Sequence, residues 1–498
     1  MVALPLRALA GVLGGAVPLA LAELAVTGVT HDSRRVLPGD LYAGLPGAQA
    51  HGATFAGQAA AHGAAALLTD PLGARIAAGA GLPTVIVPDP RAVLGFVASR
   101  VYGDPSRSLS VYGVTGTNGK TTTAYLLEAG LRAAGHTTGL LGTIETRVAG
   151  ERLASARTTP EAPDLQALLA LMLERGVRSV AMEVSSHALA LGRVDGTHLR
   201  AALFTNLSQD HLDFHPTMQD YYDAKASLFT PDRCDLGVVC VDDAWGSRLA
   251  AQAAGRGLPV LTVGTAGSWR VRGRGPEFRL RPPDGVELAA SVRLLGGFNV
   301  TNAALALTAL TATGVPAELA AAGIAGLPGV PGRMEPVDEG QPFLAVVDYA
   351  HTPEAVVTLL QTLRPLTAGR LFAVLGCGGD RDRGKRPLMG AAVARYADVA
   401  LLTDDNPRSE PSAVILAAVE AGAREVPAQQ RAQVIVEPDR AAAVALAVGL
   451  ARPGDTVVVA GKGHESGQEV AGRVTPFDDR SVLRHALRPA SAALGGGR

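Results

Sequence analysis

The chain has 498 residues, of which 47% are hydrophobic and 18% are charged, and its formal net charge is −1. This length predicts about three domains, and the near-neutral charge argues against a nucleic-acid-binding protein. The cysteines Cys234, Cys240 and Cys377 form no C-x-x-C pair, so neither a disulfide framework nor a structural zinc site is expected. No apolar stretch reaches the length of a membrane span. We therefore expect a reduced, soluble protein with no nucleic-acid partner and no membrane insertion.

The N-terminus has two interpretations. Arg7 and the apolar stretch 8–22 resemble a secretory signal. The alternative is a short helix that packs on the first domain and is interrupted at Gly14, Gly15 and Pro18. The glycine-rich sequence TGTNGKTTT (115–123) favours the helix, because a nucleotide-dependent protein is expected in the cytoplasm.

The first predicted domain covers residues 1–103. Short apolar runs over 40–43, 63–69 and 84–87 predict strands that alternate with alanine-rich helices. The turn cluster Gly103-Asp104-Pro105-Ser106 follows them and predicts a linker.

A central domain is predicted over residues 104–333. From Leu109 the pattern changes to a strand, a glycine-rich loop and a helix, which begins a parallel α/β domain. Further apolar runs typical of buried strands lie at 178–184, 201–207 and 236–241. A Gly/Pro/Arg-rich section (267–295) has a strand-like pattern, and the cluster at 327–333 predicts a second linker.

The C-terminal domain is predicted over residues 334–498. Four apolar runs separated by helical patterns predict a second parallel sheet; they lie at 343–350, 371–380, 399–405 and 456–465. Each run ends in a polar motif, and ligands of open α/β sheets bind at the carboxyl ends of strands. The predicted fold class is therefore α/β with three domains: a small N-terminal domain, a central P-loop-type parallel sheet domain and a C-terminal Rossmann-like domain.

The sequence GTNGKT, which begins at Gly116, resembles a phosphate-binding loop. Gly116 and Gly119 permit backbone angles that turn successive amides toward an anion. Lys120 adds a positive charge, and the hydroxyl of Thr121 at the helix start can bind Mg²⁺. The strict pattern requires a glycine at position 114, which is Val114. An ordinary glycine-rich turn is the alternative, but the flanking strand and helix favour phosphate binding.

Two further side chains are candidate Mg²⁺ ligands. Glu183 ends the run RSVAMEV, where a carboxylate can reach a nucleotide-bound metal, although it can equally be an exposed strand-end carboxylate. His211 follows another strand end, although a lone histidine is more often structural. These residues alone leave both alternatives open.

Lys225 lies in the predicted helix DYYDAKASLF. Tyr221, Lys225, Leu228 and Phe229 are spaced i, i+4, i+7 and i+8, so they share one apolar stripe. An ammonium group there is partly desolvated, which lowers its pKa and favours the neutral amine. Such a lysine can extend its head group to water, or its neutral amine can react with CO₂ to form a carbamate that binds Mg²⁺. The pattern alone does not decide between the two.

Eleven motifs occur in an order that resembles the Mur ligase family, and the resemblance covers nearly the whole chain. They are TGTNGKTTT (115–123), TTPE (158–161), MEVSSHAL (182–189), NLSQDHLDFH (206–215), YYDAK (221–225), GGFNVTN (296–302), VPGRME (330–335), DYAHTP (348–353), GCGGDRDRGKRP (376–387), DDNPR (404–408) and AGKGHE (460–465). The segment HDSRRVLPGDLYAGLPG (31–47) also resembles the family's uridine-binding domain. The family's loop is spelled TGTNGKT, without the strict first glycine.

The resemblance implies an ATP-dependent amide ligase of peptidoglycan synthesis, and hence of cell-wall biogenesis, cell shape and cell division. Its small-molecule substrates would be ATP, UDP-MurNAc-L-Ala-D-Glu and a diamino acid. ATP would convert the D-Glu carboxylate into an acyl phosphate, which an amine then attacks. The implied cofactors are Mg²⁺ and a CO₂-derived carbamate on Lys225. We expect a cytoplasmic enzyme that acts as a monomer.

The resemblance also assigns roles to individual residues. The implied ATP-binding residues are Gly116, Thr117, Asn118, Gly119, Lys120, Thr121, Thr122, Asn302, Arg333, Asp348 and His351. The implied Mg²⁺ ligands are Thr121, Glu183, His211 and carbamylated Lys225, and the catalytic set is Lys120, Lys225, Glu183 and His211. Ser33, Thr158, Thr159, Ser185 and Arg193 would bind the UDP-sugar dipeptide.

The C-terminal domain would recognise the incoming amino acid. The implied residues are Arg386, Asp405, Asn406, Arg408, Gly461 and Glu465. The form Asp-Asn-Pro-Arg favours meso-diaminopimelate, because two arginines can hold its distal carboxylate while Glu465 faces the amine. Arg408 can instead pair with a neighbouring acid such as Glu410, so L-ornithine and L-lysine remain alternatives.

Other classes fit less well. A ligase similar to folylpolyglutamate synthase shares the phosphate loop and the lysine, but HDSRRVLPGD (31–40) and DNPR (405–408) argue against it. A P-loop ATPase that regulates a partner needs no amino-acid pocket. A dinucleotide oxidoreductase is weakly supported, because GCGGD (376–380) lacks the G-x-G-x-x-G pattern.

Overall fold

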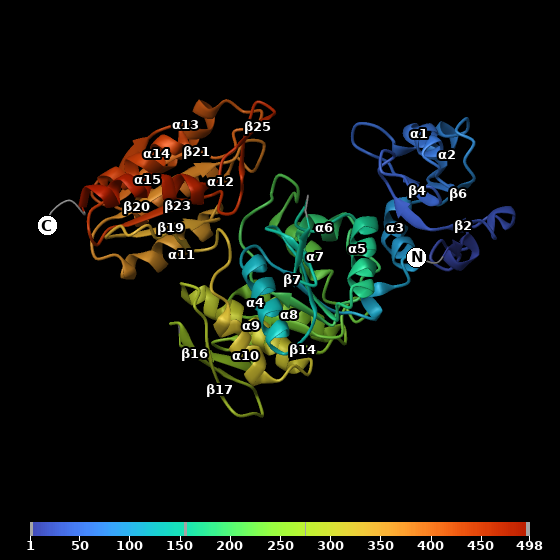
Figure 1. The fold of residues 1–498 in the computed structure, drawn as a ribbon, viewed down its shortest axis with the longest axis horizontal. Coiled ribbons are helices and arrows are strands. Elements are labelled where there is room, and N and C mark those ends of the chain that lie inside the picture. Colours follow the sequence, from blue (N-terminus) through green and yellow to red (C-terminus); the bar gives the residue numbers. More distant parts are fainter. Residues whose placement is uncertain (1–2, 154–156, 274, 495–498) are drawn as a thin grey trace.

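The computed structural model describes residues 3–153, 157–273 and 275–494, and three bodies follow one another along the chain (Figure 1). The N-terminal body lies beside the central one, and the C-terminal body lies on the opposite side of it. The strands of the three main sheets come from 28–86, 110–291 and 335–460. Each sheet therefore lies within one of the three predicted domains. None of the described helices is long and apolar enough to cross a bilayer.

The N-terminal body is built on a four-stranded parallel sheet. Its strands are β3 (Gly28–Thr30), β4 (Asp40–Gly44), β5 (Ala66–Thr69) and β6 (Thr84–Ile86), and its helices are α1 (Ala56–Ala61), α2 (Pro71–Ile76) and α3 (Pro90–Val101). Leu6, Leu9 and Leu13 are buried in the same apolar cluster as the sheet. The N-terminal segment thus packs on the first domain, as the helix interpretation predicted, although Leu6–Leu9 is a short 3₁₀ helix.

The central body contains a mixed sheet of eleven strands in the order β10-β9-β8-β11-β7-β12-β13-β14-β15-β16-β17. Its strands are β7 (Ser110–Thr115), β8 (Thr138–Leu141), β9 (Thr146–Val148), β10 (Glu151–Leu153), β11 (Ser179–Glu183), β12 (Ala201–Phe204), β13 (Gly237–Cys240), β14 (Val260–Gly264), β15 (Trp269–Arg272), β16 (Glu277–Arg281) and β17 (Leu288–Ser291). The predicted parallel sheet forms its centre, where β7 lies between β11 and β12. The 267–295 section adds antiparallel strands at one edge.

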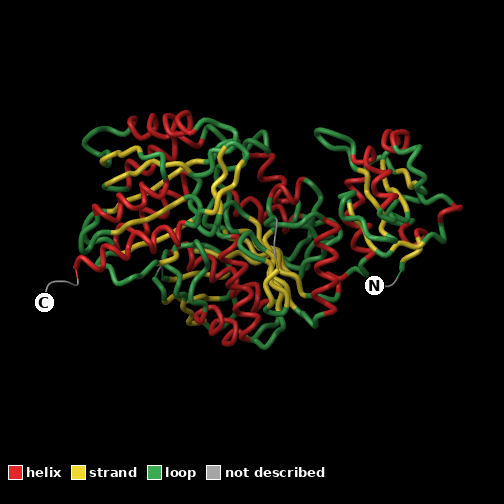
Figure 2. Tube along the Cα trace, turned by 45° about the horizontal axis from the view of Figure 1, so that its top comes forward, coloured by secondary structure: helices red, strands yellow, loops and turns green. Residues whose placement is uncertain are grey.

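Helices cover both faces of this sheet, which is why its central strands are apolar on both sides. The helices are α4 (Lys120–Ala133), α5 (Ala162–Glu174), α6 (Ser186–Ala190), α7 (Met218–Ala226), α8 (Ala244–Gly255), α9 (Gly297–Ala312) and α10 (Ala317–Gly326). One apolar cluster contains residues of α4, α9 and α10, and a second contains residues of α5, α7 and α8. Figure 2 shows the central strands side by side with helices around them.

The C-terminal body contains a six-stranded sheet in the order β18-β19-β23-β20-β21-β22. Its strands are β18 (Glu335–Pro336), β19 (Leu344–Asp348), β20 (Leu371–Cys377), β21 (Val399–Asp404), β22 (Gln433–Val436) and β23 (Thr456–Ala460), with a separate hairpin of β24 (Gly467–Val470) and β25 (Arg473–Pro476). Its helices are α11 (Pro353–Leu363), α12 (Lys385–Tyr396), α13 (Ser412–Glu425), α14 (Arg440–Leu450) and α15 (Asp479–Leu494). The four predicted strands are present and parallel; β18 and β22 were not predicted.

The N-terminal and central bodies meet at a close backbone approach. Helix α3 packs against α5, and a Cβ on Gly95 would lie 2.4 Å from the carbonyl oxygen of Asp195. The hydroxyl of Ser99, one turn further along α3, donates to the carbonyl of Gly196 at 3.0 Å. Glycine at position 95 therefore allows the helix to lie directly on the central body.

Candidate active site

The glycine-rich loop joins β7 to α4, as the sequence predicted, and its glycines are sterically required. Gly116 has φ +150°, and a Cβ there would lie 1.9 Å from Thr205 Oγ1. Gly119 has φ +86°, and its Cβ would lie 2.6 Å from Asn302 Oδ1. Val114 lies inside β7 and is fully buried. Position 114, where the strict pattern requires a glycine, therefore lies in the buried strand and not in the loop.

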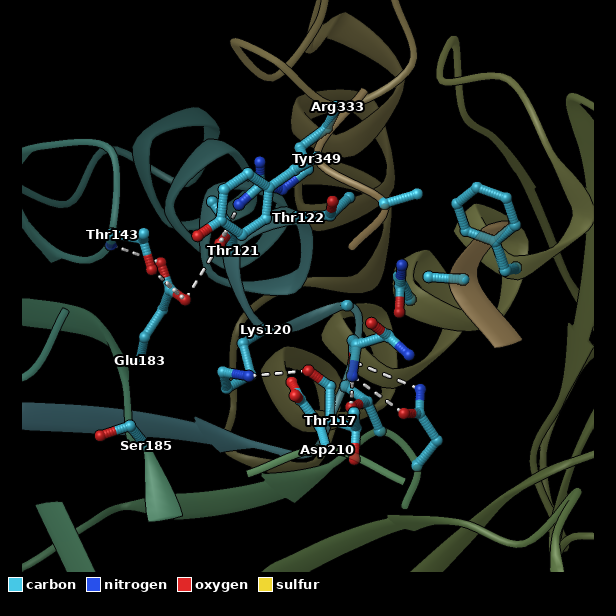
Figure 3. A pocket seen from close by; sticks show the side chains of 18 of the residues that line it. Thr117, Lys120, Thr121, Thr122, Thr143, Glu183, Ser185, Asp210, Arg333 and Tyr349 are labelled. Atoms are coloured by element: carbon cyan, nitrogen blue, oxygen red, sulfur yellow. Dashed lines mark hydrogen bonds between the residues drawn. The ribbon is translucent and has the colours of Figure 1, made fainter. Parts of the chain in front are cut away.

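Two lysines converge on the carbonyl groups of this loop. Lys120 donates to the carbonyls of Gly116 and Thr117, both at 2.9 Å, and Figure 3 shows its head group beside Thr117. Lys225 donates to Gly116 O at 2.8 Å. Burial lowers the pKa of both amines, well below the ordinary value for Lys225, and lysine–lysine repulsion adds to the effect on Lys225. No ion pair among the described residues involves either lysine.

The predicted apolar stripe around Lys225 is confirmed. Lys225 is 1% exposed, and Tyr221, Leu228 and Phe229 are equally buried. Its Nζ lies 4.5 Å from the centre of the Tyr221 ring. Helix α7 ends at Ala226, so Leu228 and Phe229 belong to the stripe but lie beyond the end of the helix. The lysine is thus a buried amine whose acceptor is a carbonyl oxygen, which suits a neutral nucleophile.

Glu183 ends β11 and faces the start of α4 (Figure 3). Its carboxylate accepts hydrogen bonds from Thr121 Oγ1 at 3.0 Å, from the Thr143 backbone NH at 2.7 Å and from Thr143 Oγ1 at 3.0 Å. Glu183 is 1% exposed. The exposed-carboxylate alternative is therefore wrong, and Glu183 is held beside the phosphate loop.

His211 lies beside a buried acid that sequence reasoning did not select, Asp210. His211 Nε2 is 3.5 Å from Asp210 Oδ2, and His351 Nε2 and Lys385 Nζ of the C-terminal body lie 3.6 Å and 3.3 Å from the same carboxylate. Burial lowers the pKa of His211 to about 3, so its ring is neutral at pH 7. Burial raises the pKa of Asp210, but the contacts with His351, His211 and Lys385 outweigh it and hold that pKa well below its usual range. Asp210 thus links two bodies across the site.

The predicted metal ligands line one cavity without forming a complete set. Among the described residues, no group of three or more His, Cys, Asp or Glu side chains is arranged to hold a metal ion. Thr121 and Glu183 are hydrogen-bonded to each other, whereas His211 and Lys225 lie elsewhere on the wall of a cavity of about 720 Å³. A carbamate on Lys225 would add a carboxylate to this wall, so the buried amine fits the predicted group.

The same cavity is lined from the C-terminal side. Arg333 Nη2 lies 3.3 Å from Thr121 Oγ1, and its guanidinium carbon is 4.2 Å from the centre of the Tyr349 ring. Asp348 accepts from the backbone NH groups of Met334 and Ala350, both at 2.7 Å. Asn302, His351 and the unpredicted Phe298 and Tyr349 also line it. Tyr349 was within reach of sequence reasoning, because it belongs to the motif DYAHTP.

Four of the five residues predicted for the UDP-sugar dipeptide also line this cavity: Thr158, Thr159, Ser185 and Arg193. Thr159 donates to the carbonyl of Glu183 at 2.9 Å, and Arg193 pairs with Glu161 at 2.9 Å. Ser33 does not line it; it lies in the N-terminal body and donates to Gln58 at 2.8 Å. A ligand bound by all five residues would span the two bodies.

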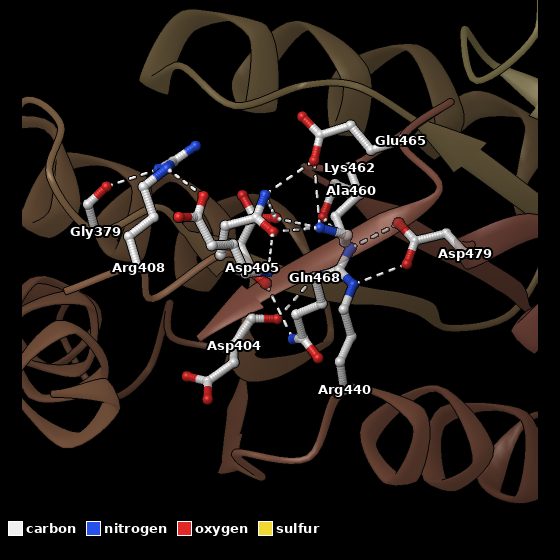
Figure 4. A network of polar contacts seen from close by, with 12 residues as sticks. Gly379, Asp404, Asp405, Arg408, Arg440, Ala460, Lys462, Glu465, Gln468 and Asp479 are labelled. Atoms are coloured by element: carbon white, nitrogen blue, oxygen red, sulfur yellow. Dashed lines mark hydrogen bonds and ion pairs between the residues drawn. The ribbon is translucent and has the colours of Figure 1, made fainter. Parts of the chain in front are cut away.

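Three of the six residues predicted for the amino acid, Asp405, Arg408 and Glu465, lie in a separate polar network of the C-terminal body (Figure 4). None of the six lines the 720 Å³ cavity. Arg408 has φ +54°, donates to Gly379 O at 2.7 Å and lies 3.5 Å from Glu469. Its backbone pairs with the β24–β25 hairpin at Val470. Asp405, Asn406 and Glu465 surround Lys462, and Gly461 (φ +114°) donates to Asp348 O at 3.2 Å.

Arg386 differs from the expectation. It is 2% exposed and donates two hydrogen bonds to Glu410, at 2.8 and 3.1 Å, and one to Gly378 O at 3.2 Å. The guanidinium is therefore not free to hold a substrate carboxylate in this structure. Glu410 was the alternative partner for Arg408 in the sequence, but it pairs with Arg386 instead. Arg408 pairs with Glu469.

Known proteins match the chain along its length. The profile "Mur ligase family, catalytic domain" matches residues 25–102, "Mur ligase middle domain" matches 114–310, and "Mur ligase, glutamate ligase domain" matches 332–463. The chain is 58% identical to the UDP-N-acetylmuramoyl-L-alanyl-D-glutamate--2,6-diaminopimelate ligase of Streptomyces coelicolor, over 98% of this chain and 97% of that one. It is 50% identical to the Corynebacterium glutamicum protein of the same name, over 94% and 93% of the two chains.

A solved structure agrees with this similarity. A UDP-N-acetylmuramoyl-L-alanyl-D-glutamate--2,6-diaminopimelate ligase superposes with a TM-score of 0.68 at 31% identity. The alignment covers 98% of this chain and 99% of the other. Sequence profiles, full-length relatives and fold therefore agree along the chain.

Proposed function

The chain belongs to the Mur ligase family, and we propose that it uses ATP to join meso-2,6-diaminopimelate to the D-Glu residue of UDP-N-acetylmuramoyl-L-Ala-D-Glu. The product is the UDP-linked tripeptide of peptidoglycan synthesis, together with ADP and phosphate. The full-length relatives whose names contain this activity support the proposal.

The reaction needs ATP because a carboxylate is a poor electrophile and hydroxide is a poor leaving group. Transfer of the γ-phosphoryl group to the D-Glu carboxylate gives an acyl phosphate and ADP. A neutral amine of diaminopimelate then attacks the acyl carbon and forms a tetrahedral intermediate. The attacking nitrogen loses one proton, and collapse of the intermediate breaks the carbon–oxygen bond to phosphate, releases inorganic phosphate and leaves the amide.

In this proposal the phosphate loop holds the ATP phosphates. The backbone amides of 116–122 and the positive end of α4 face the anion, and Lys120 balances charge that develops during transfer. Asn302 and Arg333 approach the nucleotide from α9 and from the segment that leads into the C-terminal body. Arg333 reaches Thr121, and Asp348 and His351 lie on the same wall. Phosphate transfer would thus take place between the two bodies.

Thr121, Glu183, His211 and carbamylated Lys225 would hold Mg²⁺, which supplies positive charge to the phosphates when bound. The neutral His211 ring and the Glu183 carboxylate are suitable ligand types. The buried Lys225 amine would attack CO₂, form a nitrogen–carbon bond and release one proton.

Amino-acid selection would rest on the C-terminal cluster. Arg408 would hold the distal carboxylate of diaminopimelate, because the guanidinium fork matches a carboxylate. Asp405 and Glu465 would face the ammonium group, and the backbone at Gly461 and the Asn406 amide would complete the pocket. We assign Arg386 to the support of this loop through Glu410 and not to direct contact. Ser33, Thr158, Thr159, Ser185 and Arg193 would bind the UDP-sugar dipeptide.

One observation carries the proposal. A single cavity holds the phosphate loop, a buried lysine without a carboxylate partner, and side chains of the C-terminal body. An ATPase that only regulates a partner has no need of the buried lysine. Such an ATPase would also leave the polar cluster of the C-terminal body without a function.

The test is phosphate release with ATP, Mg²⁺ and UDP-MurNAc-L-Ala-D-Glu, with diaminopimelate, lysine or ornithine added one at a time. We expect diaminopimelate to support release far more efficiently than lysine or ornithine does. Release with lysine or ornithine in its place would keep the ligase and overturn the assignment of Arg408. Release that is independent of all three amino acids would contradict the ligase.

A further inference from the structure

A buried lysine in the amino-acid cluster, Lys462, carries no role in the proposed function. It follows β23, and its side chain is 0% exposed. Its Nζ lies 3.3 Å from Asp405 Oδ1, 2.9 Å from Asn406 Oδ1 and 3.2 Å from Glu465 Oε2. An ammonium group has three N–H donors, and each has an acceptor here. Lys462 thus has no donor left for a substrate.

The neighbouring amide is also fully used. Asn406 Oδ1 accepts from Lys462 and from the Glu469 backbone NH at 3.0 Å. Asn406 Nδ2 lies 2.9 Å from Glu465 Oε2 and 3.4 Å from Asp405 Oδ1. Among the hydrogen bonds of the described residues, none uses the other oxygen of each carboxylate, Asp405 Oδ2 or Glu465 Oε1. Figure 4 shows the second oxygen of Glu465 directed away from the cluster.

A second buried ion pair lies beneath this cluster. Arg440 and Asp479 are both 0% exposed and are joined by bonds of 2.7 and 2.8 Å. Arg440 also donates to the carbonyls of Ala460 at 2.9 Å and Asp404 at 3.3 Å. These two carbonyls belong to the ends of β23 and β21, which lead directly into Lys462 and Asp405. The pair therefore fixes the backbone on which the upper cluster is built.

The charges of the cluster leave one negative charge over. Arg440 and Asp479 cancel, and Lys462 neutralises one of the two carboxylates, Asp405 and Glu465. The side chains of Asp405 and Glu465 are 12% and 32% exposed, and a nearby opposite charge stabilises a partly buried carboxylate, so an additional cation satisfies the cluster. The ammonium group of an amino acid supplies such a cation, and the two free carboxylate oxygens are the acceptors available for it.

We propose that Lys462 is a positioning residue of the amino-acid site. It holds one oxygen of Asp405 and one of Glu465, so that the other oxygen of each is presented to the ammonium group of the incoming diamino acid. It does not touch the substrate, because its donors are all used. This inference rests on the proposed function and extends it to a residue that sets the affinity for the amino acid.

The test is Lys462→Met, which keeps the length of the side chain and removes its charge and donors. Loss of charged hydrogen bonds that orient two acceptors is expected to raise the KM for diaminopimelate about 10- to 100-fold. The KM values for ATP and for UDP-MurNAc-L-Ala-D-Glu should stay within about twofold of wild type. The kcat at saturating diaminopimelate should stay within about threefold, because ATP, the UDP-linked substrate and the chemical step depend on the cavity around the phosphate loop. A general loss of structure would change all of these constants together.

The control is Arg424→Met, which removes an exposed cation of the same body that pairs with Glu420 and should leave every constant unchanged. If Lys462→Met does not fold, Lys462→Gln replaces it; glutamine keeps two N–H donors without the charge and should raise the same KM about 10-fold. An unchanged KM for diaminopimelate, or a parallel rise in all three KM values, overturns the inference. If the wild-type protein forms no product with any of the three amino acids, the proposed function is contradicted instead.

Discussion

The two polar sites differ in how their buried cations are paired. In the phosphate-loop site, the hydrogen bonds of Lys120 and Lys225 within the described residues go to carbonyl oxygens, and no carboxylate of those residues pairs with either lysine. In the C-terminal cluster every buried cation has a carboxylate partner: Lys462 has Asp405 and Glu465, Arg386 has Glu410, and Arg440 has Asp479. The first site therefore holds amines that are not paired with a carboxylate of the described residues, whereas each cation of the second site is paired with one.

This difference matches the ligands proposed for each site. Triphosphate brings several negative charges, so a site in which Lys120 has no carboxylate partner gains the attraction that such a carboxylate would otherwise cancel. A diamino acid is close to neutral overall, so a cluster whose cations are paired and which has one negative charge left over can distinguish its ends by the position of a few free groups. We therefore expect substitutions in the first site to abolish the chemistry, and those in the second to change selectivity or stability.

The largest expected effect is at Lys225. Lys225→Ala should lower the rate of phosphate release and product formation by roughly 10³-fold, because the proposed carbamate and its charge are lost. The cavity left by the missing side chain is large enough for a small carboxylate. Added formate or acetate should therefore restore part of the rate, as measured by product formation under otherwise identical conditions.

Two controls make this test specific. Chloride at the same ionic strength should not restore the rate, because it cannot replace a carboxylate. Lys225→Met fills the same space and should be inactive with or without formate. Full activity of either variant would exclude a carbamate at this position and weaken the contrast between the sites.

A smaller effect, on selectivity, is expected at Arg408. Arg408→Ala should raise the KM for diaminopimelate roughly 10- to 100-fold, the range of a lost charge-assisted pair. The KM for lysine, which has no distal carboxylate, should change by less than about threefold. The ratio of kcat/KM for the two amino acids is the measurement, and it should fall in the variant.

The matched control for Arg408 is Arg473→Ala, which removes an exposed arginine from the adjoining β24–β25 hairpin. It should leave the ratio unchanged. If Arg408→Ala lowers kcat/KM equally for both amino acids, Arg408 does not read the distal carboxylate, and the selectivity lies elsewhere in the cluster.

Much of the phosphate-loop site could be predicted because its signals are local. The strand, loop and helix around Gly116 follow one another in the sequence, and the burial of Lys225 was visible in the spacing of its own helix. Glu183 was predicted from its place at a strand end, although its burial was not. The edge strand β22 (Gln433–Val436) escaped because its apolar run has only three residues, 434–436, and they are partly exposed.

The pairing of charges could not be predicted, because it depends on contacts between distant segments. Asp210 meets Lys385 only when the central and C-terminal bodies are assembled. The choice of Glu410 by Arg386, and of Glu469 by Arg408, is made by the packing of α12 and the hairpin. An arginine in a sequence motif shows that a cation is present, but its free or paired state is a property of the fold.

The smallest effect is expected at Glu410, where the pair is structural. The hydrogen bonds from Arg386 lower the pKa of Glu410 from its ordinary 4.5 to about 2. A carboxylate whose pKa is lower in the folded state stabilises the fold above pH 4.5, and this contribution is lost as the pH falls toward 2. Glu410→Gln should therefore lower Tm by about 2 °C at pH 7, and the difference from wild type should shrink between pH 4.5 and 3.

Glu420→Gln is the matched control, because Glu420 forms an exposed ion pair with Arg424 in the same body, and exposed pairs contribute little to stability. Its Tm should follow that of the wild type at every pH. If Glu410→Gln instead leaves Tm unchanged and alters the KM for diaminopimelate, Arg386 touches the substrate after all. The C-terminal cluster would then contain a second available cation, and its contrast with the phosphate-loop site would be one of degree.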